Sequence, residues 1–338
     1  MNKKVLVTGG AGYIGSHTVV ALYEAGYIPV IVDNYQNSSP DVIQKINTIT
    51  GKKVATYNLD ICGLHSLSEV WEKEQPDFVI HFAAYKAVGE SVAEPLLYYR
   101  NNVVGLLNVL ECVQRYGTKG IVFSSSCTVY GEPDQCPVTE QTPQKPATSP
   151  YGATKQMCER ILQDQAIAQK DSRIMALRYF NPVGAHPSSQ IGELPNGTPN
   201  NLVPYLTQAT AGLRDPLTIF GNDYDTPDGT CVRDFIHVMD LADAHVASLH
   251  YLQSTTQAFT ALNVGTGNGT SVMQLITAFQ EATGQKAPYI MGPRRDGDVI
   301  KIWADTSLSQ KVLGWSPKRT LQDSMRDSWN WQVALGAR

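Results

Sequence analysis

Short apolar runs alternate with longer amphipathic stretches through the first half of this 338-residue chain. The apolar runs have the length of buried strands, and the longer stretches have the periodicity of helices. The predicted strands cover residues 5–8, 29–32, 54–58, 78–82, 120–124 and 174–179. The main predicted helices cover residues 96–116 and 151–169. This alternation predicts an α/β fold of the Rossmann type, a doubly wound parallel sheet with its ligand at the carboxyl ends of the strands.

The pattern changes after Asn181, where prolines and glycines crowd residues 181–201 and predict irregular backbone. The later predicted elements are helices at 202–212, 238–252 and 272–283 and strands at 217–220 and 261–264. We therefore expect a first domain over residues 1–180, to which a later segment at about 235–265 returns. The rest of residues 181–338 would form a smaller, discontinuous, mixed α/β substrate lobe.

Composition narrows the class of protein without defining it. The chain is 42% hydrophobic and 17% charged, with a net charge of −4, which gives no reason to expect a nucleic-acid or membrane partner. Its six cysteines lack metal-type spacing, so we expect no metal site and reduced thiols in the cytoplasm. We find no secretory signal and no run of transmembrane length.

Three glycines follow the first predicted strand, at Gly9, Gly12 and Gly15, and a helical pattern follows them. Strand, glycine turn and helix are the context of a dinucleotide-binding loop, which sets a pyrophosphate at the helix N-terminus. Asp33 ends the second predicted strand, eighteen residues after Gly15. A carboxylate there would bind ribose hydroxyls and repel a 2′-phosphate, so the pattern favours NAD over NADP. The alternative is a tight turn with a surface aspartate.

Tyr151 and Lys155 stand four residues apart, on one face of a predicted helix that Ser149 and Pro150 would begin. A cation near a phenol lowers its pKa, so the pair predicts a phenolate base that takes a proton from an alcohol. Ser126 closes a predicted strand at the ligand edge and could relay that proton. The alternatives are an ordinary exposed Tyr and Lys, and serines that serve only in a turn.

Two arginines of the second lobe, Arg233 and Arg295, suit a diphosphate because a guanidinium binds phosphate oxygens in pairs. The alternative is that the neighbouring carboxylates Asp234 and Asp296 pair with arginines at the surface.

Five segments carry a resemblance, in this order: TGGAGYIGSH, HFAAYKAVGES, SSSCTVYG, SPYGATK and RYFNPVGAHP. Together they resemble the extended short-chain dehydrogenase/reductase family. Downstream, FGNDYDTPDGTCVRDFIHVMDLADAH and RRDGD are similar to the UDP-glucose 4-epimerases of that family. The resemblance runs nearly end to end. It implies reversible C4 epimerisation of UDP-glucose and UDP-galactose through a 4-keto sugar, with tightly bound NAD, in a homodimer.

The resemblance also implies roles for individual residues. The implied catalytic set is Ser126, Tyr151 and Lys155. The implied NAD-binding residues are Gly9, Gly12, Tyr13, Ile14, Gly15, Asp33, Asn34, Asp60, Ile61, Phe82, Lys86, Asn101, Ser126, Tyr151, Lys155 and Tyr179. The implied UDP-hexose-binding residues are Ser126, Tyr151, Asn181, Asn201, Leu202, Phe220, Arg233, Arg295, Asp298 and Ile302.

The residues after Ser126 distinguish between other activities of this fold. A nucleotide-sugar 4,6-dehydratase normally has an Asp-Glu pair there, whereas this chain has Cys127 and Thr128. Cys127 could act as an acid or base in C3 or C5 epimerisation, or simply fill space. A nucleotide-sensing module without turnover is a further alternative, which the intact catalytic set opposes.

Two further expectations concern single positions. Family members carry Tyr or a small residue where this chain has Ile302, beside the 2-position of the sugar. Because Ile is intermediate in bulk, we expect weak activity on UDP-N-acetylhexosamines. We expect His17, His81, Trp329 and Trp331 to serve in packing.

Overall fold

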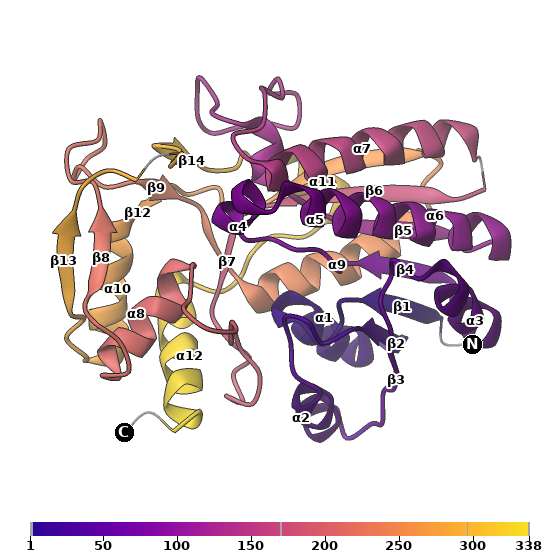
Figure 1. Cartoon of the computed structure of the whole chain (residues 1–338), viewed down its shortest axis with the longest axis horizontal. Coiled ribbons are helices and arrows are strands. Elements are labelled where there is room, and N and C mark those ends of the chain that lie inside the picture. Colours follow the sequence, from indigo (N-terminus) through magenta and orange to yellow (C-terminus); the bar gives the residue numbers. More distant parts are fainter. Residues whose placement is uncertain (1–2, 170, 296, 337–338) are drawn as a thin grey trace.

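A computed structural model describes residues 3–169, 171–295 and 297–336. The larger of its two lobes is built on a seven-stranded parallel sheet (Figure 1). The strands lie in the order β11 (Phe259–Val264), β6 (Arg173–Tyr179), β5 (Gly120–Ser126), β4 (Phe78–His81), β1 (Lys4–Thr8), β2 (Ile28–Asp33) and β3 (Ala55–Asn58). The strand order reverses between β4 and β1, and open α/β sheets bind their ligands at such a switch point.

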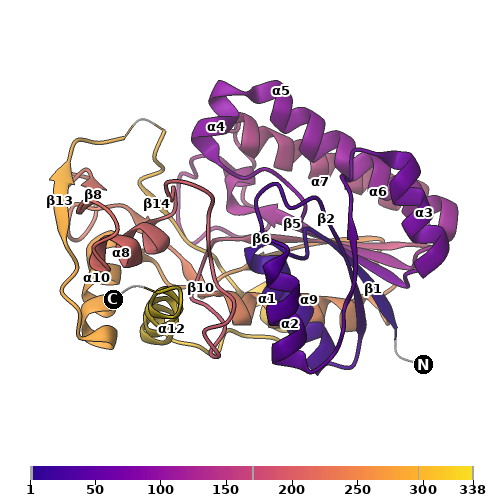
Figure 2. The same ribbon diagram turned by 60° about the horizontal axis from the view of Figure 1, so that its bottom comes forward.

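Helices cover both faces of the sheet, so that its inner strands are buried on both sides (Figure 2). One face carries α3 (Leu64–Glu74), α4 (Val88–Ala93), α5 (Pro95–Tyr98), α6 (Gly105–Tyr116) and α7 (Pro150–Ala168). The other carries α1 (Tyr13–Glu24), α2 (Asp41–Thr50), α9 (Val238–Leu252) and α11 (Ser307–Leu313). Each face has its own apolar core, and side chains of β1 alternate between them: Val5 and Val7 join one, and Leu6 the other.

The predicted strands of the first half are confirmed, with ends that differ by at most two residues. The predicted helix at 96–116 is helical throughout but not uniform. A π-helical turn, Tyr99–Val104, separates α5 from α6. The strand predicted at 261–264 is part of β11, which lies beside β6 at the edge of the large sheet. The doubly wound parallel sheet inferred from the alternating pattern is therefore confirmed.

The second lobe combines small sheets with three helices. Its sheets are β10 (Phe235–His237) with β7 (Asn181–Val183), β12 (Thr270–Ser271) with β9 (Val232–Arg233) and β14 (Lys301–Ile302), and β13 (Tyr289–Gly292) with β8 (Leu217–Phe220). Its helices are α8 (Leu202–Thr210), α10 (Val272–Thr283) and α12 (Leu321–Ala334). They enclose an apolar core that includes Leu206, Ile219, Phe279 and Met325.

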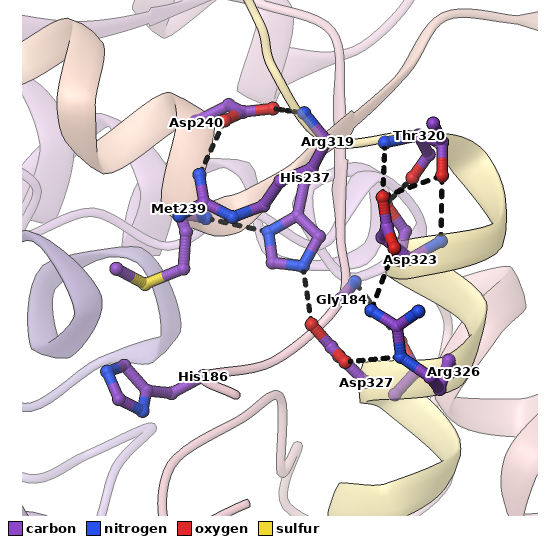
Figure 3. A network of polar contacts seen from close by, with 12 residues as sticks. Gly184, His186, His237, Met239, Asp240, Arg319, Thr320, Asp323, Arg326 and Asp327 are labelled. Atoms are coloured by element: carbon purple, nitrogen blue, oxygen red, sulfur yellow. Dashed lines mark hydrogen bonds and ion pairs between the residues drawn. The ribbon is translucent and has the colours of Figure 1, made fainter. Parts of the chain in front are cut away.

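A polar network ties α12 to the start of α9 (Figure 3). The Nδ1 atom of His237 accepts a hydrogen bond from the Met239 amide at 3.0 Å, and its Nε2 atom lies 3.2 Å from Asp327 Oδ2. Arg319, just before α12, pairs with Asp240 of α9 at 2.5 Å. Because α9 packs on the large sheet, these contacts hold the second lobe against the carboxyl edge of that sheet.

Candidate active site

Close backbone packing explains the glycines that join β1 to α1. Gly9 has a φ of +71°, and its amide donates to the Val32 carbonyl at 2.8 Å. A Cβ at Gly9 would lie 2.8 Å from the Ala83 amide nitrogen, and one at Gly15 would overlap the carbonyl oxygen of Gly9. The loop can therefore bring its backbone close to a ligand only with glycine at these positions.

The N-terminus of α1 has the properties of an anion site. Within the described residues, no side chain caps this helix and no acidic residue stands in its first turn. The amides at Tyr13, Ile14 and Gly15 are thus left for an outside acceptor, and the helix dipole favours a negative one. The Tyr13 hydroxyl donates to the Gly184 carbonyl at 2.7 Å, which links this helix end to the second lobe. The loop fits the pyrophosphate of NAD.

The residues expected near adenosine lie together at the carboxyl ends of β2 and β3. Asp33 is 8% exposed, and its Oδ2 atom accepts a hydrogen bond from the Ala11 amide of the glycine loop at 2.9 Å. Asn34 donates from Nδ2 to Asp60 Oδ2 at 3.1 Å, and Ile61 beside it is buried. The Asp33 carboxylate is therefore held in a fixed orientation beside the loop.

The predicted start of the catalytic helix is confirmed. The Ser149 hydroxyl accepts from the Gly152 amide at 3.2 Å, and Pro150 is the first residue of α7. The Lys155 ammonium lies 5.8 Å from the centre of the Tyr151 ring. It donates a hydrogen bond to the Ser124 carbonyl of β5 at 2.6 Å, a partner that the sequence did not indicate. That bond fixes the cation at the edge of the sheet.

Burial changes the acidity of both groups. It raises the pKa of Tyr151 to about 12, against a smaller opposite effect of the Ser126 hydroxyl. It lowers the pKa of Lys155 to about 8, against the opposing influence of Cys158 and Glu159. The sequence predicted that Lys155 lowers the pKa of Tyr151 below its usual value. In the protein without cofactor this prediction is wrong, because loss of solvation disfavours the phenolate more than the neighbouring groups favour it.

Ser126 ends β5 beside Tyr151, as its position in the sequence suggested. Its hydroxyl accepts from the Thr128 amide at 3.2 Å and so begins a 3₁₀ turn, Cys127–Tyr130. Cys127 packs at the margin of an apolar cluster that contains Ile302, and burial raises the pKa of its thiol to about 11. A protonated thiol beside apolar side chains matches the packing interpretation and opposes that of a base.

Tyr179 and Phe82, expected on the nicotinamide side of NAD, meet at His245. The Phe82 ring lies 4.7 Å from the His245 ring. His245 Nδ1 donates to the Leu241 carbonyl at 2.8 Å, so its Nε2 atom accepts from the Tyr179 hydroxyl, also at 2.8 Å. Burial lowers the pKa of His245 to about 4, which keeps this arrangement neutral. No sequence signal singled out His245.

Lys86 and Asn101, also expected at NAD, each have a polar side-chain partner. Lys86 Nζ lies 3.0 Å from Glu193 Oε1, and Asn101 donates to the Asn102 side chain at 3.0 Å. Glu193 also accepts from Asn201 Nδ2 at 2.5 Å, so one carboxylate joins a residue expected at NAD to one expected at UDP. Glu193 could not be predicted from the sequence, because nothing in the chain order relates it to either partner.

The expected UDP-binding residues occupy the second lobe. Asn181 is in β7, Asn201 precedes α8, Leu202 begins that helix, and Phe220 ends β8. Ile302 of β14 stands beside Arg233 of β9 in the paired strands. Arg233, Phe220 and Ile302 thus share the small sheets of this lobe.

The arginine partners differ from the alternative drawn from the sequence. Arg233 donates to the Val232 carbonyl at 2.9 Å, whereas Asp234 is fully buried and accepts from the Ala304 amide and other backbone amides. The alternative that Arg233 and Asp234 form an ion pair at the surface is therefore wrong. Asp296 lies outside the described residues. Arg295 pairs with Asp298 at 2.6 Å and covers the Phe220 ring at 5.2 Å.

The packing expectations are confirmed. His81 is buried and shares a 2.7 Å hydrogen bond with Thr8, and burial lowers its pKa to about 3. His17 is buried against the Tyr13 ring. Trp329 packs against the core of the second lobe, where it meets Phe279 edge to face, and Trp331 is buried.

The chain is similar to known proteins over nearly its whole length. A family model described as GDP-mannose 4,6 dehydratase matches residues 6–328. UDP-glucose 4-epimerase 2 of Arabidopsis thaliana is 50% identical over 334 residues, which are 98% of this chain and 95% of that protein. The UDP-glucose 4-epimerase of Stenotrophomonas maltophila, solved with bound NAD and formylated UDP-arabinopyranose, is 47% identical and covers 99% of both chains with a TM-score of 0.96. That of Bifidobacterium longum, in complex with NAD+ and UDP, is 45% identical and covers 98% of both chains with a TM-score of 0.95.

Identity of this extent over nearly the whole of each chain establishes the relationship, and it agrees with the glycine loop and the Tyr151–Lys155 pair. The chain belongs to the UDP-glucose 4-epimerases of the extended short-chain dehydrogenase/reductase family.

Proposed function

We propose that this protein interconverts UDP-glucose and UDP-galactose by inverting C4 of the hexose. The observation that carries the proposal is the catalytic edge itself. Tyr151, the Lys155 ammonium 5.8 Å from its ring, and Ser126 meet at the carboxyl end of β5. The glycine loop lies at the same edge of the sheet, at the end of β1. A base for an alcohol and a site for a hydride acceptor are the two parts that oxidation of C4 requires.

The cofactor of the proposal is NAD, which the glycine loop and the first turn of α1 would hold by its pyrophosphate. Asp33 and Asn34 would bind the adenosine ribose, with Asp60 and Ile61 beside the adenine. Phe82, Lys86 and Tyr179 would line the nicotinamide side, and Asn101 would also contact the cofactor. When bound, NAD supplies the acceptor for the C4 hydride and returns that hydride in the second half of the reaction.

In the proposed mechanism, the Tyr151 phenolate accepts the proton of the C4 hydroxyl, directly or through Ser126. Loss of that proton and of the C4 hydride leaves a 4-keto sugar. After the sugar has turned its other face, Tyr151 returns the proton to the C4 oxygen as hydride is restored to carbon. Lys155 stabilises the phenolate electrostatically while the hydroxyl of Ser126 orients the C4 oxygen. The proton, the hydride and the charge of the base are all restored, so the cycle needs no net reductant.

The sugar can turn only if UDP is held firmly and the hexose loosely. Arg233 and Arg295 supply guanidinium groups for the diphosphate, and Asn181 and Asn201 supply amides. The remaining residues of this set are Leu202, Phe220, Asp298 and Ile302. Since Arg295 is paired with Asp298 across an exposed surface, substrate phosphate would exchange with this carboxylate at modest cost.

Ile302 shapes the proposed substrate range. Its side chain is 4% exposed and packs in the cluster that includes Tyr130, Val138 and Phe180. A side chain fixed in this way leaves more room beside the sugar than tyrosine and less than cysteine or serine. The enzyme would therefore strongly prefer UDP-glucose and UDP-galactose and have weak activity on the N-acetyl sugars.

The proposed assembly is a homodimer in the cytoplasm. Apolar side chains are exposed on α4–α7 and the π-helical turn, at Val88, Val92, Leu96, Leu97, Val104, Leu107 and Met157. Exposed apolar side chains gathered on one layer of helices favour association. All six cysteines are free thiols, and no helix among the described residues has the length and apolarity to cross a bilayer. Sedimentation of the protein and of Leu96→Glu tests the dimer: a monomeric parent protein contradicts it.

The proposed division of labour places NAD on residues 1–180 together with about 235–265, and the UDP-sugar on the rest of 181–338. This division is supported by two observations: β11 pairs with β6 in the large sheet, and α9 packs on that sheet.

Product analysis tests the function directly. Purified protein is incubated with UDP-galactose and, in parallel, with UDP-N-acetylglucosamine, without added reductant. We expect conversion of UDP-galactose to UDP-glucose and slow conversion of the N-acetyl sugar. A 4-keto-6-deoxy product would mean dehydratase activity, and no turnover with retained NAD would mean a binding module. Equal rates on both sugars would contradict the proposed preference.

A further inference from the structure

A buried ion pair lies directly behind the catalytic edge. Glu159 is in α7, one helical turn beyond Lys155, and Arg178 is in β6. Their side chains are 1% and 5% exposed. Arg178 donates from Nη2 to Glu159 Oε2 at 2.6 Å and from Nε to Oε1 at 2.9 Å, a bidentate geometry. Burial opposes the charge on Arg178, but Glu159 and Tyr130 together outweigh that effect, and the pKa of the guanidinium lies above its usual value.

The same carboxylate reaches the strand that carries the catalytic serine. Glu159 Oε1 accepts a short hydrogen bond from the Ser125 hydroxyl. Ser125 stands between Ser124, whose carbonyl binds Lys155, and Ser126, which lies beside Tyr151. One buried side chain therefore holds the end of β5 against α7, at the place where both contacts to the catalytic pair are made.

The charges around Lys155 give Glu159 a second effect. From α7, Lys155 is faced by Tyr151, Cys158 and Glu159. From β5 it meets the Phe123 ring and the Ser124 carbonyl, and from β4 it lies near His81. Burial keeps the thiol of Cys158 and the ring of His81 neutral at physiological pH, since it raises the pKa of the first to about 11 and lowers that of the second to about 3. Among the described neighbours of Lys155, Glu159 is therefore the one that carries a negative charge.

We propose that Glu159, oriented by Arg178, is a positioning residue of the epimerase: it fixes the end of β5 beneath Tyr151 and keeps Lys155 protonated in a buried site. The inference rests on the proposed function, because it assigns Lys155 the task of stabilising the Tyr151 phenolate. It goes beyond that function in extending the catalytic unit to a residue that touches neither substrate nor cofactor.

The pH dependence of turnover separates this role from a purely structural one. Lys155 is cationic below a pKa of about 8 and loses its charge as the pH rises through that value. Removing the Glu159 charge lowers the pKa of Lys155 further. In Glu159→Gln, the alkaline limb of the rate profile should therefore move to lower pH by about half a unit to one unit. Glu159→Asp keeps the charge and should return the limb toward its original position, even if the shifted carboxylate lowers kcat.

The matched control is Glu140→Gln. Glu140 lies at the other end of the same buried network, where its carbonyl accepts from Arg178 at 3.2 Å and its Oε1 atom accepts from the Asn263 amide. Among the described residues, Glu140 contacts neither Ser125 nor Lys155. Removing its charge should therefore leave the alkaline limb of the rate profile where it is. Equal limb shifts in both Gln variants would overturn the proposal.

A readout independent of turnover completes the test. Protein is labelled with [6-¹³C]lysine, the Lys155 signal is assigned with Lys155→Met, and its titration is followed by NMR. We expect a lower pKa in Glu159→Gln and a higher one in Arg178→Met, where the Glu159 charge is uncompensated. If Glu159→Gln does not fold, Arg178→Met alone decides by the direction of its shift. An unmoved Lys155 titration in a folded variant overturns the inference. Absence of turnover in the parent protein would instead refute the proposed function, while the titration would still test Glu159.

Discussion

Replacing Lys155 with methionine removes the cation beside the proposed base while keeping a side chain of similar length. The ammonium lies 5.8 Å from the centre of the Tyr151 ring. If the phenolate charge is placed at the ring centre and the effective dielectric constant is about 20, the ammonium stabilises the phenolate by about 3 kcal/mol, or about two pKa units. We therefore expect Lys155→Met to lower kcat about 100-fold near pH 7, because a smaller fraction of Tyr151 is ionised at any given pH.

The shape of the pH profile provides the sharper test. In the parent protein, assistance by Lys155 is present below its pKa of about 8 and is lost as the pH rises above it. Ionisation of Tyr151 becomes easier over the same range, so the parent profile should be bell-shaped. In Lys155→Met only the phenol remains, and the rate should rise continuously with pH. The assay is initial conversion of UDP-galactose from pH 6 to 10, with NAD content measured in each sample.

A matched variant distinguishes this effect from general damage. Lys119→Met makes the same replacement at a lysine that is 65% exposed and pairs with Asp77 at the opposite end of β5. It should leave both the rate and the profile unchanged. Loss of the Lys155 ammonium also leaves the Ser124 carbonyl without that donor, which costs about 1–3 kcal/mol and should lower Tm in Lys155→Met alone. A variant that keeps within threefold of the parental kcat and retains the alkaline limb would refute the electrostatic role.

Four further replacements test the rest of the site. Tyr151→Phe should abolish turnover but keep the fold and bound NAD, as circular dichroism and cofactor absorbance would show; substantial residual turnover would overturn the base assignment. Arg233→Lys should raise KM for UDP-galactose about 10-fold or more with a smaller change in kcat, since a lysine cannot bind two phosphate oxygens in parallel; an unchanged KM would remove Arg233 from the diphosphate site. Ile302→Tyr should eliminate any conversion of UDP-N-acetylglucosamine and preserve that of UDP-galactose, measured by product chromatography; N-acetyl activity that persists would show that this position does not set the range. Gly15→Ala should weaken NAD retention through dialysis because its methyl group would overlap the Gly9 carbonyl; normal retention would contradict the close packing of the loop.

Features with a local cause could be predicted from the sequence. Gly9 has a positive φ and Gly15 packs on the Gly9 carbonyl in the same turn, and Ser149 and Pro150 begin α7 through their own geometry. The inner strands of the large sheet were predictable because they are compact apolar runs buried on both faces, whereas the edge strand β3 is partly exposed. The spacing of Tyr151 and Lys155 likewise placed both on one face of a helix before any tertiary contact was known.

Partners that lie far apart in the chain escaped prediction. Glu193 reaches Lys86 across 107 positions, and His245 meets Tyr179 across 66. Neither pair leaves a pattern, since the contact arises only when the second lobe and α9 fold against the sheet. Two-residue strands such as β9, β12 and β14 were also missed, because runs this short have no periodicity and exist only through pairing with one another.

The acidity of Tyr151 depends on a further quantity that spacing does not reveal, the loss of solvation. With a pKa of about 12, ionising the phenol at pH 8 costs about 5 kcal/mol in the protein by itself. The proposed base therefore needs positive charge that the folded chain does not fully supply. Lys155 provides part of it, and its own pKa of about 8 leaves little margin before that contribution is lost. A nicotinamide cation would add charge only in the oxidised cofactor, when a proton has to be removed from C4. Its loss on reduction would raise the pKa of Tyr151 again, so that the phenol holds the proton until it is returned to the C4 oxygen. Burial of the pair thus makes base strength dependent on the state of the cofactor, which a solvent-exposed Tyr and Lys at the same spacing could not achieve.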